Sequence, residues 1–188
     1  MSSNYPRIGL IPIGEIPEII PKIIAGHLLG YLHLTADILP PMEHPYYAMD
    51  KKRLQYDAGL ILKEMESRAF APFAKLIGVV NLDIFVPIFT HVYGEARQGG
   101  RHALVSIYRL KRNEDGSTPP QPVFLERTAK VALHELGHLF KMGHCMDEHC
   151  LMHFSGDLES LDKAPLFFCR YCAIYLKDFL IRPPSPTV

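Results

Sequence analysis

The stretch from His134 to Phe154, HELGHLFKMGHCMDEHCLMHF, gathers five histidines, two cysteines and three carboxylates into 21 residues. Its first part, HELGH, lies in a segment from about Phe124 to about Phe140 whose apolar residues have helical spacing. A helix turns about 100° per residue, so His134 and His138 lie about 40° apart on one face, one turn apart. Two imidazoles so placed can bind one metal ion. This requirement constrains both the helix and the chain that follows it.

A third ligand is expected because a catalytic zinc centre has three protein ligands and an open position. His144 is the candidate. In an unbroken helix it would lie roughly 240° around from His138 and about 9 Å further along, so the helix must end between them. Gly143 is one place where the chain can turn. Glu135, beside the histidine face, is placed to act as a general base on a metal-bound water rather than as a ligand. The alternative interpretation is a surface helix rich in His and Glu.

A second metal site is indicated by the cysteines. The chain has four, in two pairs: Cys145 with Cys150, and Cys169 with Cys172. This spacing is typical of a closed, tetrahedral thiolate zinc site with a structural role. Because Cys145 directly follows His144, the thiolate site would also hold the third histidine in place. The alternatives are two disulfides, which a reducing compartment disfavours, or free core thiols. His149 and His153 are interpreted as solvated loop residues.

The composition is that of a globular protein with one domain: 188 residues, 48% apolar and 21% charged. The formal net charge is zero, and only Lys163 and Arg170 are basic near the cysteines. We therefore expect no nucleic-acid partner, although a salt-dependent shift of DNA or RNA would revive a nucleic-acid-binding zinc module. The N-terminus lacks a basic leader with a sustained apolar run, and no apolar stretch is long enough to span a bilayer. These features predict a cytoplasmic chain with no membrane partner.

Strand and helix patterns alternate along the chain, which predicts a mixed α/β fold with a mainly parallel sheet. From Cys145 to the last helix the pattern indicates a loop. The predicted strands are 7–13, 33–39, 76–85, 90–96 and 102–110, and the predicted helices are 19–32, 56–70, about 124–140, and 172–181.

The run HELGHLFKMGH, followed by C-x4-C-x-M and then CxxC, resembles the archaemetzincins, a branch of the metzincin clan of zinc metalloproteases. The upstream run GVVNLDIFVPIFTHVYGEA is also similar, so the resemblance covers most of the chain. It implies a metzincin-like fold: a twisted mixed sheet with packed helices, an active-site helix that ends at the cleft floor, and a small zinc-stabilised C-terminal subdomain. Residues 1–144 and 145–188 would form the two subdomains of one catalytic domain.

The resemblance also implies roles for single residues and two zinc ions per chain. Glu135 would be the base, and 90–96 would contain the substrate-binding edge strand. Met152 matches the methionine of the turn beneath the metal, although a gap-filling core methionine would be preferred without the resemblance. The zinc ligands would be His134, His138 and His144 at the catalytic ion, and Cys145, Cys150, Cys169 and Cys172 at the structural ion.

One position departs from the family pattern. Metzincins have a glycine seven residues after the first histidine, and this chain has Lys141. That glycine takes the left-handed conformation that ends the helix. Lysine there costs roughly 1–2 kcal/mol, because its Cβ crowds the following carbonyl. We expect Lys141 to take this conformation, since the offset of His144 is kept, and the alternative is a later turn at Gly143.

These features predict a monomeric zinc metallopeptidase that hydrolyses peptide bonds in a peptide or protein substrate, with a zinc-activated water and Glu135 as general base. An extended substrate would add to the edge strand. The alternative is a catalytically dormant zinc-binding or regulatory protein of the same fold, and Lys141 is the observation that supports it.

Overall fold

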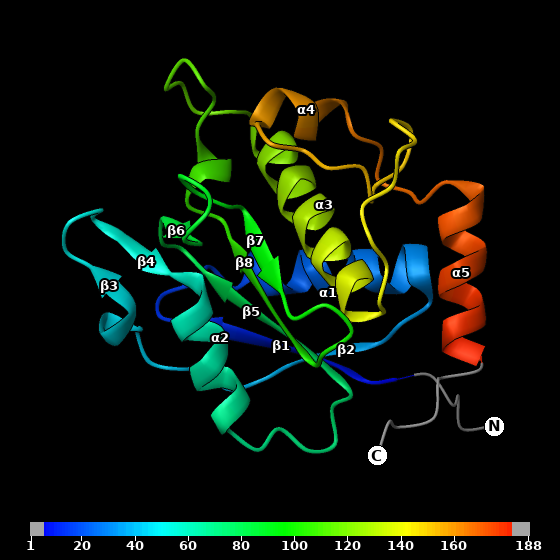
Figure 1. Cartoon of the computed structure of the whole chain (residues 1–188), viewed down its shortest axis with the longest axis horizontal. Coiled ribbons are helices and arrows are strands. Elements are labelled where there is room, and N and C mark those ends of the chain that lie inside the picture. The colour runs from blue at the N-terminus through cyan, green and yellow to red at the C-terminus, as the bar shows by residue number, and fades with distance from the viewer. Residues whose placement is uncertain (1–5, 182–188) are drawn as a thin grey trace.

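The fold is a five-stranded sheet with helices on both faces, followed by a loop-rich C-terminal part (Figure 1). The computed structural model describes residues 6–181. The strands are β1 (Ile8–Ile13), β2 (Ala36–Ile38), β3 (Met49–Asp50), β4 (Gln55–Asp57), β5 (Lys75–Val80), β6 (Ile84–Phe85), β7 (Gly94–Ala96) and β8 (His102–Ser106). The α-helices are α1 (Ile19–Leu32), α2 (Ala58–Ser67), α3 (Gln121–Leu139), α4 (Leu158–Lys163) and α5 (Arg170–Ile181). Short 3₁₀ helices cover Tyr46–Ala48 and Arg109–Lys111.

The main sheet has the strand order β2-β1-β5-β8-β7. Its first four strands pair in parallel, and β7 pairs antiparallel with β8 at the edge, with Glu95 opposite Leu104. A second sheet joins β3, β4 and β6. The predicted mixed α/β fold with a mainly parallel sheet is therefore confirmed. Within residues 6–181, the structure has no helix long and apolar enough to cross a membrane.

The central strand β5 is buried on both faces. Ile77 and Val79 belong to a core cluster that includes residues of α1 and α3, whereas Leu76 and Val80 belong to a cluster that includes residues of α2. Successive side chains of a strand point to opposite faces. A strand covered on both faces reads as a continuous apolar run, which is why the sequence pattern identified this one.

The strand predicted over 76–85 is broken, and that prediction was wrong in its second half. After Val80 the chain leaves the sheet, and Ile84–Phe85 pairs with β4 instead. The break contains Asp83, whose carboxylate accepts two hydrogen bonds from Arg109, at 2.7 and 2.8 Å. Inside a strand that is buried on both faces, this carboxylate would be separated from Arg109, and an unpaired buried charge is costly. The strand therefore ends before Asp83.

Other boundaries also differ from the prediction. The strand predicted over 102–110 ends at Ser106 and continues into the second 3₁₀ helix, and the strand predicted over 90–96 keeps only Gly94–Ala96. Helix α4 was not predicted, because its six residues are too few to show a periodic pattern. Helix α1 has the predicted bounds.

Helix α3 packs against α1 and the inner strands and carries the HELGH motif in its last turns. The Arg127 side chain is 4% exposed and donates two hydrogen bonds of 2.6 Å to the carboxylate of Asp162 on α4. This pair fixes α4 against α3, so α4 can form one wall of the cleft described below.

Candidate metal centre and cleft

The two histidines of HELGH are oriented by carbonyl groups on the loop that follows the helix. His134 Nδ1 lies 2.8 Å from the Leu151 carbonyl oxygen, and His138 Nδ1 lies 2.8 Å from that of Met142. A carbonyl can only accept, so each Nδ1 carries the proton and each Nε2 of a neutral ring presents a lone pair. The two Nε2 atoms lie 3.0 Å apart. Two lone pairs at this distance repel each other, and a cation between them removes the repulsion.

The turn after α3 brings the third histidine back to the same point. Lys141 N donates to His138 O, and Met142 N donates to Gly137 O at 3.1 Å, the hydrogen-bond pattern of a Schellman motif. Lys141 occupies the left-handed position with φ of 64°, as predicted. Gly143 is not among the residues with positive φ, so the alternative turn at that glycine is not used.

The three imidazoles converge. The ring centroid of His144 lies 5.3 Å from that of His134 and 4.9 Å from that of His138. One ligand nitrogen from each ring lies within 4.8 Å of the others. Ligands around a tetrahedral zinc ion with bonds of about 2.05 Å lie about 3.3 Å apart, so the 3.0 Å between the two helical Nε2 atoms fits zinc within a few tenths of an ångström.

Burial keeps these rings in the form that binds metal. It lowers the pKa of His134 to about 4, and it also lowers the pKa values of His138 and His144. Neutral imidazole is the ligand form, because a protonated ring has no lone pair to donate. The site is therefore ready for a cation at neutral pH without having to lose protons.

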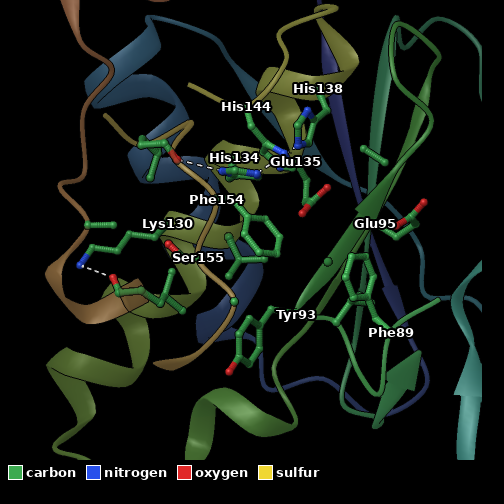
Figure 2. Close-up of a pocket in the computed structure, with 18 of the residues that line it drawn as sticks. Phe89, Tyr93, Glu95, Lys130, His134, Glu135, His138, His144, Phe154 and Ser155 are labelled. Atoms are coloured by element: carbon green, nitrogen blue, oxygen red, sulfur yellow. Dashed lines mark hydrogen bonds between the residues drawn. The ribbon is translucent and has the colours of Figure 1, made fainter. Parts of the chain in front are cut away.

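Glu135 lies between the histidine face of α3 and the edge strand β7. The residue is 7% exposed, and burial raises the pKa of its carboxyl group well above the usual value, with a smaller contribution from Glu95. Figure 2 shows its carboxylate beside His134 and His138, on the side of the cleft that faces β7. A carboxyl group with a raised pKa is suited to taking up and returning a proton.

The four cysteines also converge. Cys145, Cys150, Cys169 and Cys172 are free thiols whose sulfur atoms all lie within 4.8 Å of one another. The Cys145 and Cys169 sulfurs are 3.9 Å apart. A tetrahedral zinc ion with bonds of about 2.3 Å separates its sulfurs by about 3.8 Å, so the spacing fits zinc, and the alternative of two disulfides is not observed.

Short contacts connect the two clusters. The Leu151 carbonyl that orients His134 comes from the residue directly after Cys150. Cys145 N donates to Met152 O at 2.8 Å, and His153 Nδ1 donates to Cys145 O at 3.0 Å. His153 is half-buried, so its prediction as a solvated residue was wrong, whereas His149 is exposed as predicted.

Met152 lies against Gly137 of α3, the residue before His138. It is fully buried, and its sulfur would be 2.5 Å from a Cβ added to Gly137. The glycine within HELGH therefore leaves the space that the methionine fills. Nothing in the sequence pattern alone requires a glycine at this position.

The histidines stand at one end of a cleft of about 440 Å³ between β7 and α3 (Figure 2). The rings of Phe89 and Phe154 face each other across it with centroids 6.4 Å apart, and Phe154 also packs on His144. The cleft is lined mainly by apolar side chains. Its lining includes Tyr93, Val131, Leu151, Leu161 and Ala164.

Lys130 also lines the cleft, but its charge is neutralised. The ammonium group lies 2.7 Å from the Glu126 carboxylate and donates to the carbonyl oxygens of Leu161 and Asp162, at 3.1 and 3.0 Å. Its side chain is 2% exposed, so the cleft meets mainly the aliphatic stem.

Sequence reasoning missed the backbone and cleft residues of the site. The carbonyls of Leu151 and Met142 leave no mark in a side-chain pattern. Gly94 lies in the run VYGEA, yet nothing in the run indicates that its Cα lies beside Glu135. Phe154 and Tyr93 could have been proposed only as aromatic residues near the motif.

The comparisons with known proteins agree in sequence and structure. The model of peptidase family M54 matches residues 28–178. The archaemetzincin of Methanocaldococcus jannaschii is 31% identical over 172 residues, which cover 92% of this chain and 93% of that protein. The crystal structure of an archaemetzincin from Methanopyrus kandleri has a TM-score of 0.85 at 31% identity, covering 97% of this chain and 99% of the other. A zinc-dependent peptidase from Methanocorpusculum labreanum has a TM-score of 0.81 at 25% identity, covering 90% and 99%.

Proposed function

This chain belongs to peptidase family M54, the archaemetzincins, and from that premise we propose how its site hydrolyses peptide bonds. The chain is a zinc metallopeptidase. The observation that carries the proposal is the convergence of three neutral imidazoles beside the buried carboxyl group of Glu135. His134, His138 and His144 would hold the catalytic zinc. When bound, zinc supplies Lewis acidity, which acidifies a water molecule and polarises the scissile carbonyl.

Glu135 would act as the general base and then as the general acid. It takes a proton from the attacking water and returns it to the nitrogen of the leaving amine. Burial raises its pKa, which strengthens it as a base, and a divalent cation at the histidines would favour the ionised form and lower the pKa again. These opposing effects suit a carboxylate that takes up a proton in the first step and returns it in the second.

The edge strand β7 would bind the substrate backbone. Tyr93 O accepts from Ser106 N, and Arg97 N donates to His102 O, so these residues face β8. Residues alternate along an antiparallel pair, so the N–H and C=O groups of Gly94 and Ala96 face outward. An extended peptide can add there as a further strand.

The apolar part of the cleft would receive a large apolar side chain next to the scissile bond. Tyr93, Leu161 and Ala164 line it, and the ammonium of Lys130 is neutralised by Glu126. A charged substrate side chain would lose its hydration among these apolar residues. We expect a peptide panel to show preference for Leu, Met or Phe over Asp or Lys at that position.

The four cysteines would hold a second, structural zinc ion, which makes two zinc ions per chain. The chemistry of the donors supports this, because burial raises the pKa values of Cys150 and Cys172 and a cation is needed to stabilise their thiolates. The proposed boundary between the subdomains, 1–144 and 145–188, falls between a histidine of one ion and a cysteine of the other. The cytoplasmic location, the monomeric state and the absence of a nucleic-acid partner stay predictions.

Replacement of Glu135 tests the catalytic assignment. We expect Glu135→Ala to retain near-normal zinc content, because the glutamate is not a ligand, and to lose hydrolysis of unstructured peptides. Glu148→Ala is the matched control, since Glu148 is an exposed carboxylate on the same segment. Metal content and peptide cleavage, with and without chelator, are the measurements.

Two outcomes would contradict the assignment. Equal activity of Glu135→Ala and wild type would remove the glutamate from the mechanism. Absence of cleavage in the zinc-loaded wild type across the panel would favour the dormant alternative. The turn at Lys141 gives that alternative no structural support, because it brings His144 to the other two histidines.

A further inference from the structure

Gly94, the first residue of β7, lies directly against the side chain of Glu135. A Cβ added to Gly94 would be 2.6 Å from Cγ, 2.6 Å from Oε1 and 2.8 Å from Cδ of the glutamate. These distances are far shorter than a van der Waals contact between heavy atoms, which is about 3.5–4.0 Å. The two residues cannot both keep their places if position 94 has a side chain.

The glycine is not required by the backbone conformation. The glycines of the described chain that have positive φ are Gly14, Gly99 and Gly116, and Gly94 is not among them. Any L-residue could adopt its conformation. Only the space that it leaves distinguishes it, and glycine commonly allows such close approach of backbone to another group.

The glutamate cannot move away with its helix, and the open direction for its side chain is the cleft that it lines, away from the strand. Glu135 is 7% exposed on a helix whose neighbouring residues Leu133 and Leu136 are buried in the core. Side chains alternate along a strand, so the Glu95 side chain lies on the opposite face. At Gly94 the glutamate therefore faces backbone atoms only. The carboxylate thus lies between α3 and a stretch of strand without a side chain, and a side chain at position 94 would displace it into the cleft.

The same stretch faces the proposed substrate. The N–H and C=O groups of Gly94 point away from β8, toward the outer side of β7, and a peptide would pair on that side. Because glycine has no side chain, the Glu135 carboxylate can lie in van der Waals contact with the strand that would align the scissile bond. With a side chain at position 94, the base and the aligned peptide would be pushed apart by about 1 Å, which is enough to lower a rate substantially.

We propose that Gly94 is a positioning residue that sets the place of the Glu135 carboxylate between the zinc-binding helix and the substrate strand. The catalytic part of this inference rests on the proposed function of Glu135 as the base. The steric part rests on the geometry alone. The two parts are tested by separate measurements.

The steric part is tested by a double-mutant cycle on the thermal midpoint of the zinc-loaded protein. Gly94→Ala in the wild-type background should lower the midpoint by roughly 2–12 °C, the range expected for overpacking in a domain of this size. In the Glu135→Ala background the opposing side chain is absent, so the same change should shift the midpoint by about 1 °C or less. In the Glu135→Gln background the shape is kept and the charge removed, so the shift should match that of the wild-type background.

The catalytic part is tested by kinetics and zinc content. Gly94→Ala should retain its zinc and lose at least about tenfold in kcat, because the base is displaced while the metal ligands are not. Gly26→Ala is the control, since Gly26 is exposed on α1 with nothing within 4 Å of an added Cβ. Glu135→Asp, shorter by one methylene, should reduce the kcat penalty of Gly94→Ala when the two are combined.

Equal midpoint shifts in the Glu135 and Glu135→Ala backgrounds would overturn the inference, and so would failure of Gly94→Ala to fold in both. An unchanged kcat in a folded, zinc-loaded Gly94→Ala protein would overturn it as well. The thermal cycle needs no turnover, so it decides the steric part even if the wild type proves to be dormant. Failure of the proposed function and failure of this inference are therefore distinguishable.

Discussion

The most informative perturbation is Cys169→Ser, because it tests whether the thiolate site supports the histidine site. The backbone N–H of Cys169 donates to the Cys150 sulfur, with the nitrogen 3.3 Å from it, and the Cys169 sulfur lies 3.9 Å from that of Cys145. The substitution removes one thiolate ligand and should release the structural zinc. Any effect on the histidines must then pass through the loop that the cysteines fix.

The structure provides two routes for this effect. Cys150 precedes Leu151, whose carbonyl orients His134 at 2.8 Å. Cys145 follows His144 and accepts a hydrogen bond from His153 at 3.0 Å through its carbonyl. Loss of groups that orient a metal ligand typically weakens metal affinity roughly 10–100-fold. We therefore expect the zinc affinity of the histidine site to fall by that factor, about 1.4–2.8 kcal/mol.

The assay combines zinc stoichiometry with competition against a chromophoric chelator, which measures the affinity of the remaining ion. Met146→Ala is the matched control, because Met146 is 94% exposed on the same loop and ligates nothing. His153→Ala breaks only the second route and should give a smaller loss. The coupling would be refuted if Cys169→Ser loses one zinc ion while the affinity of the histidine site stays within twofold of wild type.

Three further predictions concern α3 and its end. Gly137→Ala should lower the free energy of unfolding in chemical denaturation. The added Cβ overpacks against Met152 at a cost of about 1–3 kcal/mol, which outweighs a gain in helix propensity of about 1 kcal/mol. Unchanged stability would contradict the close contact between the two residues. Lys141→Gly should be about 0.5–1 kcal/mol more stable than Lys141→Ala, which keeps the strain at φ of 64°, and equal stabilities would argue against strain. In the metal-free protein the folded pKa of His134 is about 4 against an ordinary 6.5, so between these values the unfolded chain binds more protons and stability falls with decreasing pH by up to about 3 kcal/mol. His134→Gln should remove this part of the dependence in pH-dependent denaturation, and an unchanged profile would contradict the burial effect.

The sequence predicted the elements that have a strong period or a fixed spacing. Helix α1 and the buried run of β5 were found because their apolar residues repeat over many positions. The convergence of His134, His138 and His144 could be anticipated because helix geometry fixes two of them and the metal requires a third. Even the conformation of Lys141 followed, since the offset to His144 leaves little choice.

The rest depended on contacts between distant segments. The break after Val80 is set by Asp83 binding Arg109, a partner in another element. The orienting carbonyls belong to backbone, which every residue has, so no residue type indicates them. The closeness of Gly94 to Glu135 arises only when β7 packs beside α3, and a glycine in a short strand is equally compatible with a bulge, a turn or an exposed edge.

The strain at Lys141 should be weighed against the metal binding that the turn permits. Strain at a left-handed lysine is about 1–2 kcal/mol. Binding of a structural zinc ion contributes about 10–16 kcal/mol in small zinc domains, and most of it becomes folding free energy. Binding of metal by the residues that follow Lys141 can therefore outweigh the strain at this position, although glycine would adopt the conformation without strain. The lysine stem also packs over Gly99, where a Cβ would be 2.8 Å from its Cγ, and Gly99 N donates to the carbonyl of His138 at 2.8 Å. Lysine in place of glycine is thus accommodated by its neighbours, and it is no argument for a dormant site.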